Sequence, residues 1–232
     1  MQPAKMFNAS LLIILAVAGA AAVFLNARWF MSDAYTRYSE GQWQWADARA
    51  SARQAAGFAY RLTPDNARAL KSAAIADLYS NQPDQALLEY RQALQLAPAD
   101  AYLWRDYAFA LVSTGHFDDR VQQAVRHAQA LAAQSDTLQL SLALIGTGVY
   151  RQSDPALRAL WLASIRHSFA AHWQPLLEAA SRAGQEELLC REVIAKPDSN
   201  PWCIQVRAKE KACRSHAAAG CDSQAGAGVS QK

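Results

Sequence analysis

The stretch from Asn66 to Asp100 reads NARALKSAAIADLYSNQPDQALLEYRQALQLAPAD, with LTPD just before it at residues 62–65 and the similar LAPA near its end at residues 96–99. Pairs of residues recur here at a spacing of 34 positions: Pro64 and Pro98, Asn66 and Asp100, Leu70 and Trp104. A fixed period of this length is typical of stacked helical hairpins, in which each period is one structural unit. We therefore expect an all-α fold built from hairpins.

The stretch predicts two helices, over residues 67–80 and 84–96, because small and apolar side chains recur there at helical spacing. The positions that define the pattern are Leu70, Ala74, Ala86, Tyr90, Ala93 and Pro98. On these residues the segment resembles the tetratricopeptide repeat (TPR), whose 34-residue hairpin places similar residues in the same order. The chain departs from the family pattern at Asp77, where an aromatic residue is usual, and at Asn81, which replaces the glycine of the turn. Asparagine tolerates positive φ, so the turn is still expected.

The resemblance extends more weakly over residues 28–189 and implies a TPR-like α-solenoid of about four degenerate helical hairpins. The unit after Asp100 keeps the first-helix pattern, whereas Arg120 stands where the second helix of the family has alanine. Helices with apolar faces are also expected over residues 154–170 and 172–183. A first helix from about Arg28 would run directly out of the apolar N-terminal segment, so the repeats would begin at the membrane.

Residues 1–27 predict a transmembrane anchor or a signal peptide. The run from Phe7 to Ala27 carries no charge, and about 20 apolar residues are enough to cross a hydrocarbon core of about 30 Å. A cleaved signal peptide is the alternative, because Lys5 precedes an apolar core and a run of small residues. Apolar residues resume at Val23, where a mature N-terminus is usually polar. This favours an uncleaved anchor.

The cysteines indicate the compartment, since all four lie near the C-terminus: Cys190, Cys203, Cys213 and Cys221. An even, clustered set is typical of disulfides formed in an oxidising environment, and three pairings are possible. We therefore predict a single-pass inner-membrane protein with a cytoplasmic N-terminus and a periplasmic repeat domain. Residues 190–221 are expected to form a Cys-containing cap, followed by a disordered tail over 222–232.

A zinc site of Cys213, His216 and Cys221 is the alternative for the cap. No C-x2-C pair precedes these residues at a usual distance, so we expect no metal and either two structural disulfides or one disulfide with two free thiols.

Charge and motifs argue against several classes of function. The net charge is +3, and residues 190–232 hold that whole excess, with seven Lys and Arg against four Asp and Glu. The body lacks the dense basic stripe of a nucleic-acid-binding protein. No nucleophile elbow, phosphate-binding glycine loop or H-E-x-x-H motif occurs. We expect neither nucleic-acid binding nor enzyme activity, and no cofactor.

The TPR resemblance implies a concave groove lined by the first helix of each hairpin, suited to an extended peptide or a partner helix. Carried over onto this sequence, the groove positions are Arg68, Lys71, Ile75 and Leu78 in one hairpin and Tyr102, Arg105 and Phe109 in the next. Lys71 and Arg105 stand one period apart. Two cations beside aromatic residues suit an acidic side chain or a C-terminal carboxylate of a partner.

These features predict a non-catalytic, membrane-tethered TPR scaffold of the bacterial envelope. It would be an accessory subunit of an inner-membrane assembly, for example one for polysaccharide biosynthesis or export, secretion or pilus formation. The alternative is a periplasmic holdase-like chaperone for exported or cytochrome-type client proteins. Partners would be other envelope or inner-membrane proteins, together with the lipid bilayer around the N-terminal helix. Gly19 and Ala22 offer a small-residue patch against which another membrane helix could pack.

Overall fold

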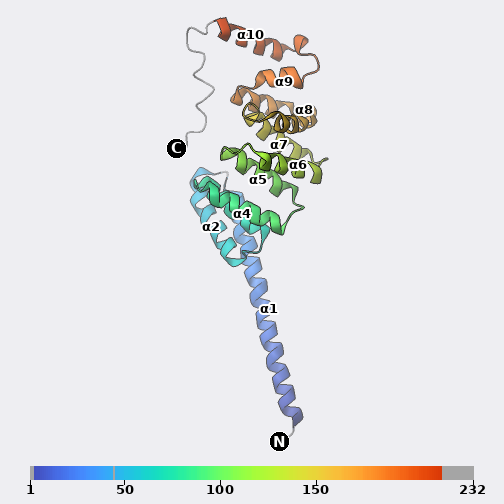
Figure 1. Cartoon of the computed structure of the whole chain (residues 1–232). Helices are drawn as coiled ribbons and strands as arrows, with labels where there is room; N and C mark the ends of the chain where they lie inside the picture. The colour runs from blue at the N-terminus through green and yellow to red at the C-terminus, as the bar shows by residue number, and fades with distance from the viewer. Residues whose placement is uncertain (1–2, 44, 216–232) are drawn as a thin grey trace. The chain divides into compact units, whose positions relative to one another are not determined.

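The computed structural model describes residues 3–43 and 45–215, and the chain divides into two compact units, Met1–Pro98 (unit 1) and Ala99–Lys232 (unit 2). Within the described residues every regular element is a helix and none is a strand (Figure 1). The all-α class predicted from the sequence is therefore confirmed. The TPR-like solenoid, as a finer description, stays a prediction.

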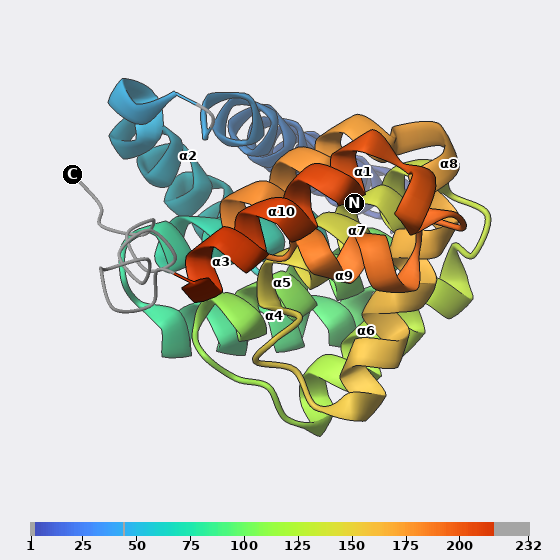
Figure 2. The same cartoon turned by 90° about the horizontal axis from the view of Figure 1, so that it is seen from above.

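Unit 1 consists of α1 (Pro3–Gln42), η1 (Ala46–Ala48), α2 (Arg49–Leu62), α3 (Ala67–Tyr79) and α4 (Pro83–Leu96). The C-terminal half of α1 packs against α2, as Figure 2 shows from above. α3 contacts both α1 and α2, and α4 pairs with α3. Two antiparallel hairpins, α1–α2 and α3–α4, thus stack on each other.

α1 is a single helix of 40 residues, which corresponds to about 60 Å of length. The described side chains before Arg28 are exposed, and they include large apolar ones such as Leu12 (67% exposed) and Phe24 (68%). The part Leu11–Gln42 contains a segment long and apolar enough to cross a membrane. The predicted direct passage from this segment into the first hairpin is confirmed, because the helix continues without a break to Gln42.

Alanine lines the surfaces on which the helices of unit 1 meet. The buried alanines are Ala52, Ala55, Ala56 and Ala59 on α2, Ala69, Ala73, Ala74 and Ala76 on α3, and Ala86 and Ala93 on α4. Such short side chains let helix backbones approach closely, and alanine loses no side-chain entropy in a helix. Larger buried side chains, such as Leu70 and Tyr90, fill the remaining space.

Capping explains why Asn66 and Asp100 recur one period apart. The Asn66 side chain accepts a hydrogen bond from the backbone N–H of Arg68 (2.9 Å), and Asp100 accepts from Tyr102 (2.9 Å) and Leu103 (3.0 Å). Each satisfies backbone donors at the start of a helix that have no partner within that helix.

The turns between paired helices also recur with the period. Asn81 (φ 58°) and Gly115 (φ 80°), 34 positions apart, both adopt the left-handed conformation that ends a helix. The substitution of asparagine for glycine in the first turn thus preserves the backbone conformation, as predicted.

Unit 2 contains α5 (Ala101–Ser113), α6 (Asp119–Leu131), α7 (Asp136–Val149), α8 (Pro155–Ala183), α9 (Glu186–Glu192), η2 (Pro197–Ser199) and α10 (Pro201–Ser215). α5 pairs with α6 and α7 with α8, and α9 links α8 to α10.

α8 breaks at His172, whose φ of −131° and ψ of 39° are not helical. Pro175 causes the break, because it has no N–H to donate to the preceding turn and its ring clashes with the carbonyl there. The break separates the two helices that the sequence predicts over 154–170 and 172–183.

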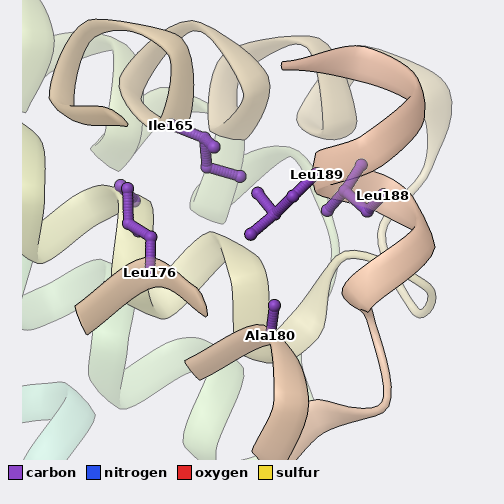
Figure 3. Packing of buried hydrophobic residues seen from close by; sticks show 6 residues of the cluster. Ile165, Leu176, Ala180, Leu188 and Leu189 are labelled. Atoms are coloured by element: carbon purple, nitrogen blue, oxygen red, sulfur yellow. The ribbon is translucent and has the colours of Figure 1, made fainter. Parts of the chain in front are cut away.

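The last helices of unit 2 bury an apolar cluster. In Figure 3, Ile165, Leu176 and Ala180 of α8 and Leu189 of α9 point toward a shared interior. Next to this cluster, the fully buried Cys190 of α9 and Cys203 of α10 form a disulfide. One of the three possible cysteine pairings is thereby selected. Cys213 belongs to α10, but its side chain, all of Cys221 and the predicted tail lie outside the described residues.

The close crossing of α7 and α8 can be tested at Gly146. A Cβ atom added there would lie 2.6 Å from Cβ of Trp161, so we expect Gly146→Ala to destabilise the chain by about 1–3 kcal/mol through overpacking. Gly148→Ala, in the same helix, is the matched control because its Cβ would meet nothing within 4 Å. Urea unfolding followed by tryptophan fluorescence measures both. Equal effects at the two positions would contradict the close crossing.

The disulfide closes a loop with a sequence separation of 13, which corresponds to about 3 kcal/mol in the chain-entropy description. We expect Cys190→Ala/Cys203→Ala to free α10 and to make the connection around residues 194–200 sensitive to protease. Limited proteolysis read by mass spectrometry measures this. A Cys213→Ser/Cys221→Ser variant should keep the protection of the wild type. Loss of protection in that variant alone would assign the bond to other cysteines.

Candidate functional site

Four of the predicted groove residues lie on α3 of unit 1. Arg68 is paired within the chain: its guanidinium donates to Glu40 (Nε to Oε1, 3.1 Å) and to Asp33 (Nη1 to Oδ1, 3.1 Å), both on α1. The hydrogen bond from Arg68 to Glu40 raises the pKa of the guanidinium. Lys71, Ile75 and Leu78 are half-buried on the same helix. A partner that uses Arg68 would therefore compete with two carboxylates of α1.

The other three predicted groove residues lie on α5 of unit 2. Arg105 forms an ion pair with Asp106 (2.6 Å), donates to Ser141 Oγ (3.2 Å) and stands 5.6 Å from the ring centre of Tyr102. Tyr102 and Phe109 are both exposed. This face thus combines accessible aromatic rings with a cation that internal contacts hold in place. The predicted set is divided between the two units, four residues in one and three in the other.

A different cavity of unit 1, here called the Glu89 cavity, was not predicted. It has a volume of about 590 Å³ and lies where α2, α3 and α4 meet. α3 contributes the acidic side chain of Asp77 to it, and α4 contributes that of Glu89. α2 contributes two basic side chains, Arg53 and Arg61, and the phenol of Tyr60. Several small residues of α2 and α3 keep the space open, Ala76 among them.

Glu89 is the most unusual group in this cavity, because it is a carboxylate that is only 3% exposed. Gln85 Nε2 donates to its Oε1 (3.0 Å), whereas its Oε2 is buried with no hydrogen-bond partner. Burial raises the pKa of Glu89 to about 7, and the negative charge of Asp77 adds to the rise. Burial likewise raises the pKa of Asp77, against the opposing effect of Arg53.

A second cavity of unit 1, here called the aromatic cavity, lies between α1 and α2, after the anchor that the sequence predicts over residues 1–27. Its volume is about 640 Å³, and its lining is mainly apolar, including Phe30, Tyr35, Tyr38 and Phe58. Tyr35 stacks on Phe58 with ring centres 5.5 Å apart, and Phe30 is 75% exposed. This surface continues the apolar surface of α1 past residue 27, where the predicted anchor ends.

The sequence predicts no metal centre, and the structure bears on this prediction in the part of the chain that it describes. No group of three or more His, Cys, Asp or Glu side chains gathers there in a way that could hold a metal ion. The zinc alternative for the cap depends on the side chain of Cys213 and on His216 and Cys221, which lie outside the described part. Gly19 and Ala22 lie on α1 within its exposed half, and their packing against another helix stays a prediction.

One sequence signal could have revealed the Glu89 cavity. Glu89 stands on the same stripe of α4 as Ala86 and Ala93, so an acidic residue interrupts an otherwise apolar face. Asp77 interrupts the apolar face of α3 in the same way, at the position where the TPR pattern has an aromatic side chain. That the two acids meet in one space depends on how α3 and α4 pack, which periodicity does not specify.

No family model matches the chain, and a search of curated proteins gives no significant match.

The raised pKa of Glu89 makes a prediction for stability. The native chain keeps a proton on Glu89 that the unfolded chain releases above a pKa of about 4.5. The contribution of Glu89 to the free energy of unfolding is therefore greatest below about pH 4.5. This contribution falls by about 3 kcal/mol as the pH rises to about 7. Glu89→Gln carries no such charge, so its stability relative to wild type should increase over this pH range.

Urea unfolding of both chains at a series of pH values measures this difference. Asp84→Asn changes an exposed carboxylate on the same helix and is the control, for which we expect no comparable trend. A difference between Glu89→Gln and wild type that does not change with pH would mean that Glu89 ionises normally.

Proposed function

We propose that the chain is a non-catalytic scaffold, tethered to a membrane by α1, that binds other proteins of the cell envelope through its helical hairpins. The continuity of α1 carries this proposal: one helix serves both as the apolar segment and as the first helix of a packed hairpin. A partner bound to unit 1 would be held at a fixed distance from the bilayer. Such positioning is the task of a scaffold.

The disulfide and the N-terminal segment support the proposed location. A buried bond between Cys190 and Cys203 fits an oxidising compartment such as the periplasm. An anchor is a better assignment than a cleaved signal peptide, because cleavage after the small-residue run would leave Val23 and Phe24 as an exposed, apolar start. The N-terminus would then be cytoplasmic and both units periplasmic.

The surfaces available for partners support protein binding. The aromatic cavity lies just after the predicted anchor, residues 1–27, so a membrane partner could reach it. The α5 face offers Tyr102 and Phe109 beside Arg105. Aromatic residues and arginine are enriched among the side chains that carry most of the energy at protein interfaces.

A periplasmic holdase is the second candidate, and the apolar lining of the aromatic cavity favours it, since broad client binding uses apolar surface. The two functions differ in stoichiometry. A scaffold retains one partner in a fixed ratio, whereas a holdase retains many clients in small amounts.

The test is extraction of the tagged full chain in mild detergent, followed by quantitative mass spectrometry. We expect one or a few stoichiometric membrane proteins, and loss of the partner from Lys71→Glu/Arg105→Glu. Arg91→Glu/Arg126→Glu is the matched control, because it makes the same charge change at exposed positions of α4 and α6. A broad set of clients would favour the holdase. Equal retention by both double variants would exclude the predicted groove as the binding surface.

A further inference from the structure

The Glu89 cavity contains a buried carboxyl group, Glu89, that forms no ion pair with any cation among the described residues, although Arg53 and Arg61 line the same cavity. Of the two arginines that line the cavity, Arg61 places its guanidinium 4.5 Å from the ring centre of Phe58. Arg53 acts on Asp77, whose pKa it lowers against the effect of burial. Among the described residues, the groups that act on Glu89 are Gln85 and Asp77, a neutral donor and a second acid.

Burial makes this arrangement costly in the absence of a ligand. A carboxylate removed from water needs hydrogen bonds or an opposite charge, and Glu89 has one hydrogen bond to Oε1 and none to Oε2. Asp77 and Glu89 come from different helices and repel each other when both are charged. A cation between them would interact favourably with both carboxylates at once.

We infer that the Glu89 cavity receives the positively charged side chain of a protein partner, an arginine or a lysine, with Asp77 and Glu89 as its counter-ions. Arginine fits this role best, because its planar guanidinium can donate to two carboxylates at the same time. The inference rests on the proposed scaffold function only in taking the cation from a protein. The cavity itself belongs to α2, α3 and α4 and is separate from the predicted groove residues.

Binding should depend on pH, because the cation needs ionised carboxylates. The charged and titratable groups that line the cavity with Glu89 are Arg53, Tyr60 and Arg61 from α2 and Asp77 from α3. On its own helix, Glu89 contacts the neutral side chain of Gln85. With the pKa of Glu89 at about 7 in the free protein, affinity should fall about tenfold from pH 8 to pH 6. In return, a bound cation should lower the pKa of Glu89.

The test uses the full chain in detergent micelles with N-acetyl-arginine N-methylamide as the probe. The corresponding citrulline compound is a neutral control of nearly the same shape, and the glutamate compound tests whether the two arginines of α2 bind an acid instead. Carboxyl carbons labelled with ¹³C report binding and the pKa of Glu89 by NMR. We expect the arginine compound to bind with a dissociation constant of about 1–10 mM and to lower that pKa, and the citrulline compound to do neither.

Two variants make the test specific. Glu89→Gln has nearly the same shape and should weaken binding about tenfold or more, whereas Asp84→Asn, on the same helix, should leave it unchanged. The wild-type titration alone decides the matter if Glu89→Gln does not fold. An unchanged Glu89 resonance at about 100 mM arginine compound, or binding of the glutamate compound in its place, would overturn the inference.

Failure here and failure of the scaffold function are distinguishable. If the chain does not bind the arginine compound but retains a stoichiometric partner, the scaffold function is supported and the cation site is rejected. A chain that binds the compound but retains no partner keeps the cation site, and the partner's side chain is then excluded as its source.

Discussion

Small hydroxyl side chains hold the C-terminal half of α1 against its neighbours, and the arrangement of unit 1 depends on them. Ser32, Thr36 and Ser39 are all buried, and their spacing places them on one face of the helix. Ser32 donates to the Ala59 carbonyl of α2 (3.1 Å), and Ser39 accepts from Ser72 of α3 (3.0 Å). A buried hydroxyl costs free energy unless it is hydrogen-bonded, so only one rotation of α1 about its axis satisfies this face. Apolar packing alone would specify that rotation far less well, because α1 is apolar on many sides.

These buried hydroxyl groups of α1 lie after its apolar segment. The residues that suit lipid and the residues that pack in the hairpin therefore occupy separate parts of the helix. Before Arg28 the helix exposes large apolar residues such as Leu12 and Phe24, which suit lipid. After Arg28 it carries hydroxyls on the face that packs on α2 and α3, and charged groups that pair with Arg68. The aromatic cavity lies after Arg28, between α1 and α2, and leaves apolar surface exposed there, with Phe30 75% exposed. If α1 is anchored in a membrane as proposed, this exposed surface is where a membrane protein would first meet the chain.

Local signals made much of the fold predictable. The 34-residue period, the caps Asn66 and Asp100, and the turn at Asn81 each depend on a few neighbouring residues, and the structure agrees with them. Non-local relations were not predictable: the pairing of Cys190 with Cys203 was one of three that the spacing allows. The two acids of the Glu89 cavity were visible as interruptions of apolar stripes. Their meeting across α3 and α4 follows from the close packing that the buried alanines permit.

The unbroken helix from Pro3 to Gln42 also couples the angular orientation of the first hairpin to that of the apolar segment. Each residue of an α-helix turns the chain by about 100°, so one residue gained or lost near Arg28 would rotate the Glu89 cavity by about 100° around the axis of α1, relative to the apolar segment. Loss of a whole turn, three or four residues, would restore the angular orientation of the cavity and change only its distance from the apolar segment. In such a sequence, substitutions within the apolar segment are therefore tolerated more easily than insertions or deletions that change its length.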